Sequence, residues 1–121
     1  MNISSITHGE NESSVIISFD PSDTTIASAC TVECVVDLDR LDNLKGIEVL
    51  FLSAVKQLEP SRLPEYQPGV PPRFSYDPAV DAAYVKISDG SAPVQRSGLA
   101  RFELNVRGEI VRIAVVFPSQ D

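Results

Sequence analysis

Hydrophobic and polar residues alternate along several short stretches of the chain, a pattern that predicts β-strands. The clearest example lies near the C-terminus, where Phe102, Leu104 and Val106 alternate with polar residues and a second alternating run covers 111–117. Gly108 lies between the two runs and can adopt the positive φ that a tight turn requires. This stretch therefore predicts a β-hairpin with one buried face.

A similar hairpin is predicted in the first half of the chain, with arms at 32–39 and 45–52. Its connection lacks glycine, but Asp42 and Asn43 tolerate left-handed backbone conformations. The arm at 45–52 alternates in such a way that Ile47, Val49 and Phe51 should face one side of the sheet and Leu50 and Leu52 the other. Further strands are predicted at 14–19, 24–30, 73–77 and 82–88.

One short helix is predicted near 52–59. The sequence there lacks glycine and places Val55 and Leu58 three residues apart. Ser53 is expected to cap this helix, and Pro60 to end it.

Two sequence blocks occur twice. Phe19-Asp20-Pro21 is followed 57 residues later by Tyr76-Asp77-Pro78, and the segment 33–53 resembles 99–119 at an offset of 66 residues. We interpret this as an internal duplication. In each copy an Asp-Pro turn joins the first two strands, and Asp20 and Asp77 are expected to cap those turns.

The prolines divide the chain, because five of the nine lie between residues 60 and 72. We expect a flexible N-terminal segment (1–13), a first repeat (14–58), a Pro-rich linker (59–72) and a second repeat (73–118). The predicted fold is mainly β (α+β at most), with two tandem antiparallel β-meander repeats packed as a pseudo-twofold single domain. A repeat of about 45 residues buries too little surface to be comfortably stable alone, so the two apolar faces should pack together.

Charge narrows the classes of partner. The 121 residues carry a net charge of −7, which disfavours binding to nucleic acid or to an anionic membrane. No stretch approaches the roughly 20 apolar residues of a membrane span, and the N-terminus lacks the features of a signal peptide, so a cytoplasmic location is expected. The expected partner is a basic protein or a second copy of the chain.

The acidic hairpin Asp37–Glu48 is the most suggestive cluster for chemistry. Its acidic residues fall at positions one, three and twelve, as in an EF-hand calcium loop, but Leu41 and Asp42 stand where an oxygen ligand and a glycine are needed. Asp37 and Asp39 would lie about 7 Å apart on a strand, a separation that suits a general acid and base. A carboxylate-based hydrolase or a metal-binding protein is therefore the alternative to a non-enzymatic interaction or assembly module.

The cysteines and the histidine add no site. Cys30 and Cys34 would lie about 13 Å apart on one strand, too far for the 4.4–6.8 Å between the Cα atoms of a disulfide, so they should be reduced. His8 is the only histidine and lies in the N-terminal segment. We predict no catalytic residue, no metal ligand and no cofactor, and the sequence leaves the binding residues unassigned.

Several of these motifs together resemble the bacterial domain of unknown function 2283 family, present as a degenerate tandem duplication. The second half matches the opening of the family pattern at Tyr76, Asp77, Pro78, Asp81, Ala82, Tyr84, Asp89 and Gly90. The first half matches its closing hairpin at Asp37, Leu38, Asp39, Gly46, Ile47 and Glu48. The resemblance implies a mostly antiparallel β-fold and no established activity.

Overall fold

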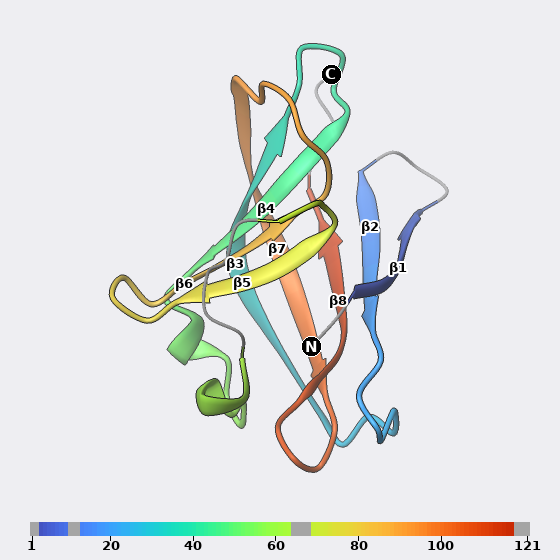
Figure 1. Cartoon of the computed structure of the whole chain (residues 1–121), viewed down its shortest axis with the longest axis vertical. Coiled ribbons are helices and arrows are strands. Elements are labelled where there is room, and N and C mark those ends of the chain that lie inside the picture. Colours follow the sequence, from blue (N-terminus) through green and yellow to red (C-terminus); the bar gives the residue numbers. More distant parts are fainter. Residues whose placement is uncertain (1–2, 10–12, 64–68, 118–121) are drawn as a thin grey trace.

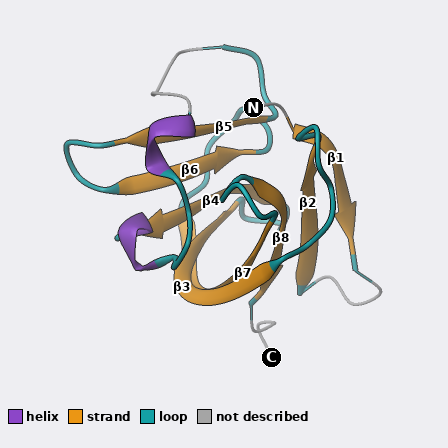
Figure 2. Ribbon diagram, turned by 90° about the horizontal axis from the view of Figure 1, so that it is seen from below, coloured by secondary structure: helices purple, strands orange, loops and turns teal. Residues whose placement is uncertain are grey.

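The protein forms one antiparallel sheet of eight strands that is nearly closed into a barrel (Figures 1 and 2). The computed structural model describes residues 3–9, 13–63 and 69–117. The strands are β1 (Ile3–His8), β2 (Ser14–Phe19), β3 (Ser28–Leu38), β4 (Leu44–Leu50), β5 (Arg73–Asp77), β6 (Ala82–Lys86), β7 (Val94–Leu104) and β8 (Ile110–Val116). Their order in the sheet is β1-β2-β8-β7-β3-β4-β6-β5. The expected mainly β architecture is confirmed.

Alternating side chains fill the inside of the curled sheet. Large residues of six strands are almost fully buried: Ile17, Val36, Ile47, Val85, Phe102 and Ile113. Phe19 of β2 and Phe74 of β5 meet edge to face, with ring centroids 5.8 Å apart. Because this contact joins the two terminal hairpins of the sheet, it helps to close the barrel across the open seam.

The strand order is symmetric. If β1, β2, β3 and β4 are exchanged with β5, β6, β7 and β8, the same strand order is obtained, read from the opposite edge of the sheet. The two longest strands, β3 and β7, form the central pair, and Glu33 lies opposite Leu99, its counterpart 66 residues later. The register shift between Asp37 and Leu38 recurs between Glu103 and Leu104 at the same spacing. The predicted pseudo-twofold arrangement is therefore present, with its axis at the centre of the β3–β7 ladder.

The terminal hairpins obey a different spacing from the one the sequence predicts. Ile6 pairs with Ile17 in β1–β2, and Phe74 pairs with Val85 in β5–β6, so equivalent residues lie 68 positions apart. The strand 14–19 is thus the counterpart of 82–86 and not of 73–77. The assignment based on the two Asp-Pro phrases is wrong, because the pairing with β8 and β4 sets the equivalence.

Two further predictions near the N-terminus are also wrong. Ile3–His8 form β1, so the segment 1–13 is not a flexible tail over that range, although 1–2 and 10–12 lie outside the described residues. No strand starts at residue 24; the segment before Ser28 is irregular, and the residues 28–30 begin the long strand β3. Pairing with β2 orders the N-terminal strand despite its polar sequence.

The hairpins of one half lie beside those of the other half. β2 pairs with β8, and β6 pairs with β4. The hairpin β1–β2 is therefore not adjacent to β3–β4, and β5–β6 is not adjacent to β7–β8. Figure 2 shows β1–β2 and β5–β6 on opposite sides of the curved β3–β7 pair. The two halves consequently share one core. The expected β-meander within each repeat is wrong, because β2 pairs with β8 instead of β3, and β6 pairs with β4 instead of β7.

The predicted helix near 52–59 is reduced to a single 3-10 turn at Leu52–Ala54, followed by a second at Pro60–Arg62. The extended backbone at Val55 (φ −76°, ψ 104°) and the positive φ at Gln57 (68°) prevent a continuous helix. Leu52, Val55 and Leu63 are buried. The first part of the Pro-rich segment therefore packs on the core instead of acting as a spacer; 64–68 lie outside the described residues.

Candidate functional site

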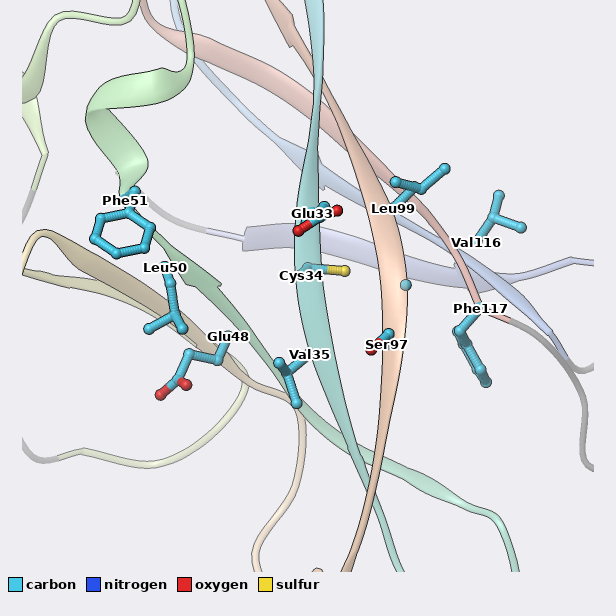
Figure 3. Close-up of a pocket in the computed structure, with 11 residues that line it drawn as sticks. Glu33, Cys34, Val35, Glu48, Leu50, Phe51, Ser97, Leu99, Val116 and Phe117 are labelled. Atoms are coloured by element: carbon cyan, nitrogen blue, oxygen red, sulfur yellow. The ribbon is translucent and has the colours of Figure 1, made fainter.

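A groove of about 700 Å³ lies at the pseudo-twofold axis, where β4 and β8 diverge from the central strands (Figure 3). The β3–β4 pairing ends at Val35 and Glu48, and the β7–β8 pairing ends at Leu99 and Val116. Beyond these pairs the strands separate, and the groove occupies the space between their ends. All four residues line it.

Exposed apolar side chains dominate this groove. Leu50, Phe51, Leu99 and Val116 have exposed fractions of 48%, 69%, 53% and 58%. Leu50 and Val116 are the last residues of β4 and β8, Phe51 follows β4 directly, and Leu99 lies within β7. All four line the same groove. A cluster of large exposed apolar side chains is characteristic of interaction surfaces, because burying it in a complex removes unfavourable contact with water.

Phe51 faces solvent because of its backbone conformation. Its φ and ψ angles are 57° and 56°, in the left-handed region that a bulky residue rarely occupies. The turn breaks the strand alternation, so Leu52 is buried in its place. The expectation that Phe51 would share a face with Ile47 and Val49 is wrong for this reason, and strand periodicity alone contains no signal for the groove.

The counterpart of Phe51 in the second half behaves in the opposite way. Phe117 is only 5% exposed, and its N–H donates to the carbonyl oxygen of Ser13 at 2.9 Å. Gly98 makes room for it, since a Cβ at that position would lie 3.2 Å from the Phe117 Cβ and 2.9 Å from the Val116 carbonyl oxygen. The two pseudo-equivalent phenylalanines thus differ: Phe51 exposes its ring in the groove, whereas Phe117 is buried.

The charge of the groove is negative. Glu33 and Glu48 line it together with the hydroxyl-bearing Ser97. Among the described residues that line it, none is Lys or Arg. An apolar surface with carboxylates at its border favours a ligand that is both apolar and cationic.

Cys34 also lines the groove but is not suited to nucleophilic chemistry. Burial raises the pKa of its thiol to about 11, so the reactive thiolate is scarce at neutral pH. Both cysteines are free, and the Cys30 thiol lies 3.7 Å from the Ala54 carbonyl oxygen. Their role in the structure is packing.

Asp39 of the acidic hairpin caps its turn. Its carboxylate accepts from the backbone N–H groups of Leu41 and Asn43 at 2.8 and 2.9 Å, and from the Asn43 side chain at 3.1 Å. The hydrogen bonds from Asn43 hold the pKa of Asp39 below its usual range. The carboxylate is therefore unsuited to act as a general acid, and its oxygens are engaged by the loop itself.

Asp37 is bound by different neighbours. Its two oxygens accept from the Tyr84 hydroxyl and the Gln95 amide, both at 3.0 Å. Among the described residues, no group of three or more His, Cys, Asp or Glu side chains is arranged to hold a metal ion. The geometry brings Asp37 into a hydrogen-bonded cluster with β6 and β7 and does not pair it with Asp39 around a common site.

Tyr84 of the second half meets the acidic hairpin of the first half in space. Because β6 pairs with β4, Tyr84 of the second half lies over Gly46 of the first half and bonds to Asp37 of the same hairpin. Burial, and secondarily the bond to Asp37, raises the pKa of Tyr84 to about 12. The pairing of β6 with β4 thus brings residues of the two halves into one hydrogen-bonded contact.

The pseudo-equivalent position in the other half holds different residues and a different interaction. The counterparts of Asp37 and Gly46 are Glu103 and Arg112, which form an ion pair on neighbouring strands. Arg112 lowers the pKa of the Glu103 carboxyl. The counterpart of Tyr84 is Ile16, which is 37% exposed.

Asp81 and Asp77 have structural roles. Asp81 accepts from the Ser53 hydroxyl at 2.6 Å and from the Tyr76 hydroxyl at 2.9 Å, which ties the β5–β6 turn to the segment after β4. Ser53 therefore binds Asp81 instead of capping a helix. Asp77 accepts from the Ala79 N–H at 3.0 Å, as expected of a turn cap. In the first Asp-Pro turn the described bond goes to Asp23, which accepts from Thr25.

Comparison with family models, curated proteins and solved structures gives no match to the chain. Within the described residues, no helix has the length and apolarity needed to cross a membrane.

Proposed function

We propose that this protein is a non-enzymatic interaction module that binds a segment of a partner protein in the groove at its pseudo-twofold axis. The observation that carries the proposal is the cluster of Leu50, Phe51, Leu99 and Val116 beside two carboxylates. The partner segment would bring apolar side chains to this cluster and Lys or Arg side chains to Glu33 and Glu48.

Charge favours a basic partner over a second copy. Each chain carries a net charge of −7, and apposing two grooves would bring two sets of Glu33 and Glu48 together. Like charges across an interface oppose association, whereas a cationic segment is attracted to the same surface.

The hydrolase and metal-binding alternatives lack comparable support. Asp39 is engaged by its own turn, and Asp37 by Tyr84 and Gln95. A catalytic pair needs two carboxylates that face one substrate, and these two side chains serve separate hydrogen-bonded clusters.

We also propose that the module acts in the cytosol. Two free thiols suit a reducing compartment, and the spacing of Cys30 and Cys34 along one strand supports their remaining unpaired.

The test uses a pair of synthetic peptides with acetylated and amidated ends, KSLSLSK and ESLSLSE, in which the charged ends and the Leu residues share one face of an extended chain. Isotope-labelled protein is titrated with each peptide and followed by amide chemical shifts. We expect saturable shifts around Glu33, Glu48 and Leu99 with the Lys peptide, weakened by added salt, and no saturation with the Glu peptide. Equal binding of both peptides, or shifts confined to another surface, would overturn the proposal.

Matched variants sharpen this test. Leu99→Ser removes one apolar side chain of the groove, and Val106→Ser makes the same kind of change at an exposed position outside it (78% exposed). Binding should weaken at least tenfold in the first variant and remain unchanged in the second. Sedimentation of the free protein adds a further outcome: a dimer that Leu99→Ser dissociates would identify a second copy as the occupant and contradict the basic-partner proposal.

A further inference from the structure

We infer that the partner segment binds as an added β-strand along the free edge of β3, a mode that rests on the proposed function of the groove. The added strand would run beside Ser28–Cys34 and enter the gap where β4 leaves β3. The groove would then recognise backbone groups as well as side chains.

The free edge follows from the pairing of β3. This strand pairs with β7 over its whole length, Ser28–Leu38, but with β4 only over Val35–Leu38. Within the described residues, no strand pairs with Ser28–Cys34 on the other side. Seven residues of strand span about 23 Å, which is long enough for a segment of six or seven residues.

β4 leaves its neighbour earlier than β8 does. The second half retains the pairs Leu99–Val116 and Ala100–Val115, whereas their counterparts, Glu33 with Leu50 and Cys34 with Val49, are absent from the β3–β4 ladder. Phe51 then turns outward directly after β4. The stretch of β3 left unpaired by β4, Ser28–Cys34, is therefore longer than the stretch of β7 left unpaired by β8, Val94–Gly98. Leu50 and Phe51 line the groove at this end of β4.

The direction of the backbone groups can be derived from the hairpin end of β3. Asp39 donates its N–H to the Asn43 carbonyl at 2.9 Å, so it faces the β4 side. Backbone groups alternate in direction along a strand, so Thr31 and Glu33 direct theirs toward the same side, while Val32 and Cys34 face β7. Both Thr31 and Glu33 are exposed. The free edge thus presents two adjacent sets of donor and acceptor groups next to the carboxylate of Glu33.

This geometry also predicts the side chains of the partner. Neighbouring side chains on one face of an antiparallel pair interact directly. On the outer face, the added strand would place a Lys or Arg beside Glu33 and apolar residues beside Leu50 and Phe51. A short extended segment meets this requirement when its basic ends and its apolar residues occupy alternate positions, because alternate side chains of a strand share one face.

The test compares two N-methylated forms of the KSLSLSK peptide, one methylated on its Leu residues and the other on its Ser residues. In a strand paired along one edge, only alternate N–H groups point to the neighbouring strand. We expect one form to bind at least tenfold more weakly than the parent peptide and the other to bind within about twofold. If both forms bind like the parent, strand addition is wrong while the groove proposal stands; if the parent itself does not bind, the groove proposal fails.

Amide hydrogen exchange locates the added strand. Binding of the parent peptide should slow exchange at Thr31 and Glu33. Gln95 and Ser97, at the corresponding free edge of β7, are the internal comparison and should be unaffected. Protection at Gln95 and Ser97 instead would place the strand on β7 and overturn the inference.

Discussion

Gly46 lies directly beneath the phenol ring of Tyr84, and a Cβ at position 46 would be 2.1 Å from the Tyr84 oxygen and 2.6 Å from the carbon that carries it. The absence of a side chain at Gly46 thus allows Tyr84 to cross from β6 over β4 and reach Asp37 on β3. This three-strand contact joins the two halves of the chain outside their shared core.

Gly46→Ala should destabilise the protein. The added methyl would force Tyr84 to rotate away and give up its bond to Asp37, at an expected cost of about 1–3 kcal/mol in the free energy of unfolding. Urea denaturation measures this cost. In a Tyr84→Ala background the same substitution should cost much less, because the ring is gone. An equal cost in both backgrounds would show that the contact does not set the requirement for glycine.

The Tyr84 hydroxyl should make stability depend on alkaline pH. Its pKa of about 12 in the folded protein lies above the ordinary value of about 10, so folding favours the protonated phenol. The contribution is complete below about pH 10 and is lost as pH rises through about 12. The unfolding free energies of the parent and Tyr84→Phe should therefore differ by a constant amount below about pH 10 and converge above it. A constant difference up to pH 12 would contradict the raised pKa.

The pseudo-twofold predicts that the Tyr84 contact can be transplanted. The triple variant I16Y/E103D/R112G gives the second site the residues of the first: Tyr84 over Gly46, bonded to Asp37. We expect it to fold and to show an additional tyrosine that ionises at higher pH than an exposed one, as measured by ultraviolet absorbance.

The control for this transplant is Ile16→Tyr alone, which retains the Glu103–Arg112 ion pair. Without glycine beneath the ring, the introduced tyrosine should remain exposed and ionise normally. Identical titrations of the two variants would mean that the paired registers do not make the sites equivalent.

The left-handed backbone at Phe51 should lower the free energy of unfolding, while it keeps the side chain exposed in the groove. Its left-handed backbone costs an L-residue about 1–2 kcal/mol, and glycine avoids this cost. Phe51→Gly should therefore unfold at higher denaturant concentration than Phe51→Ala, while both lose affinity for the Lys peptide. If the Ala variant were as stable as the Gly variant, the left-handed backbone would not be a source of strain.

The hairpins could be predicted because their information is local. Alternation in 102–117 and the turn glycine at Gly108, whose φ is 76°, specify the β7–β8 hairpin without reference to the rest of the chain. The same holds for the turn at Asp42, with a φ of 64°. The predicted offset of 66 residues also relates the residue pairs of β3–β4 to those of β7–β8 in the structure.

The equivalence of the terminal hairpins could not be predicted in this way. The similar phrases around Asp20 and Asp77 lie at different places in the two halves, because only pairing with β8 and β4 defines which strand is which. β1 was not predicted because its sequence is largely polar. Its side chains contribute little to the core, and its pairing with β2 holds it in place. The groove was missed because Phe51 interrupts the alternation at the end of β4.

The sequence by itself determined the β class, the two central hairpins and the acidic charge, since each follows from periodicity, turn residues or composition. The tertiary structure decided that the hairpins alternate between halves in the sheet, that Tyr84, Gly46 and Asp37 meet, and that four apolar side chains gather around an acidic groove. These outcomes depend on pairing between residues far apart in the chain and on one left-handed backbone angle, and neither leaves a periodic signal in the order of the amino acids.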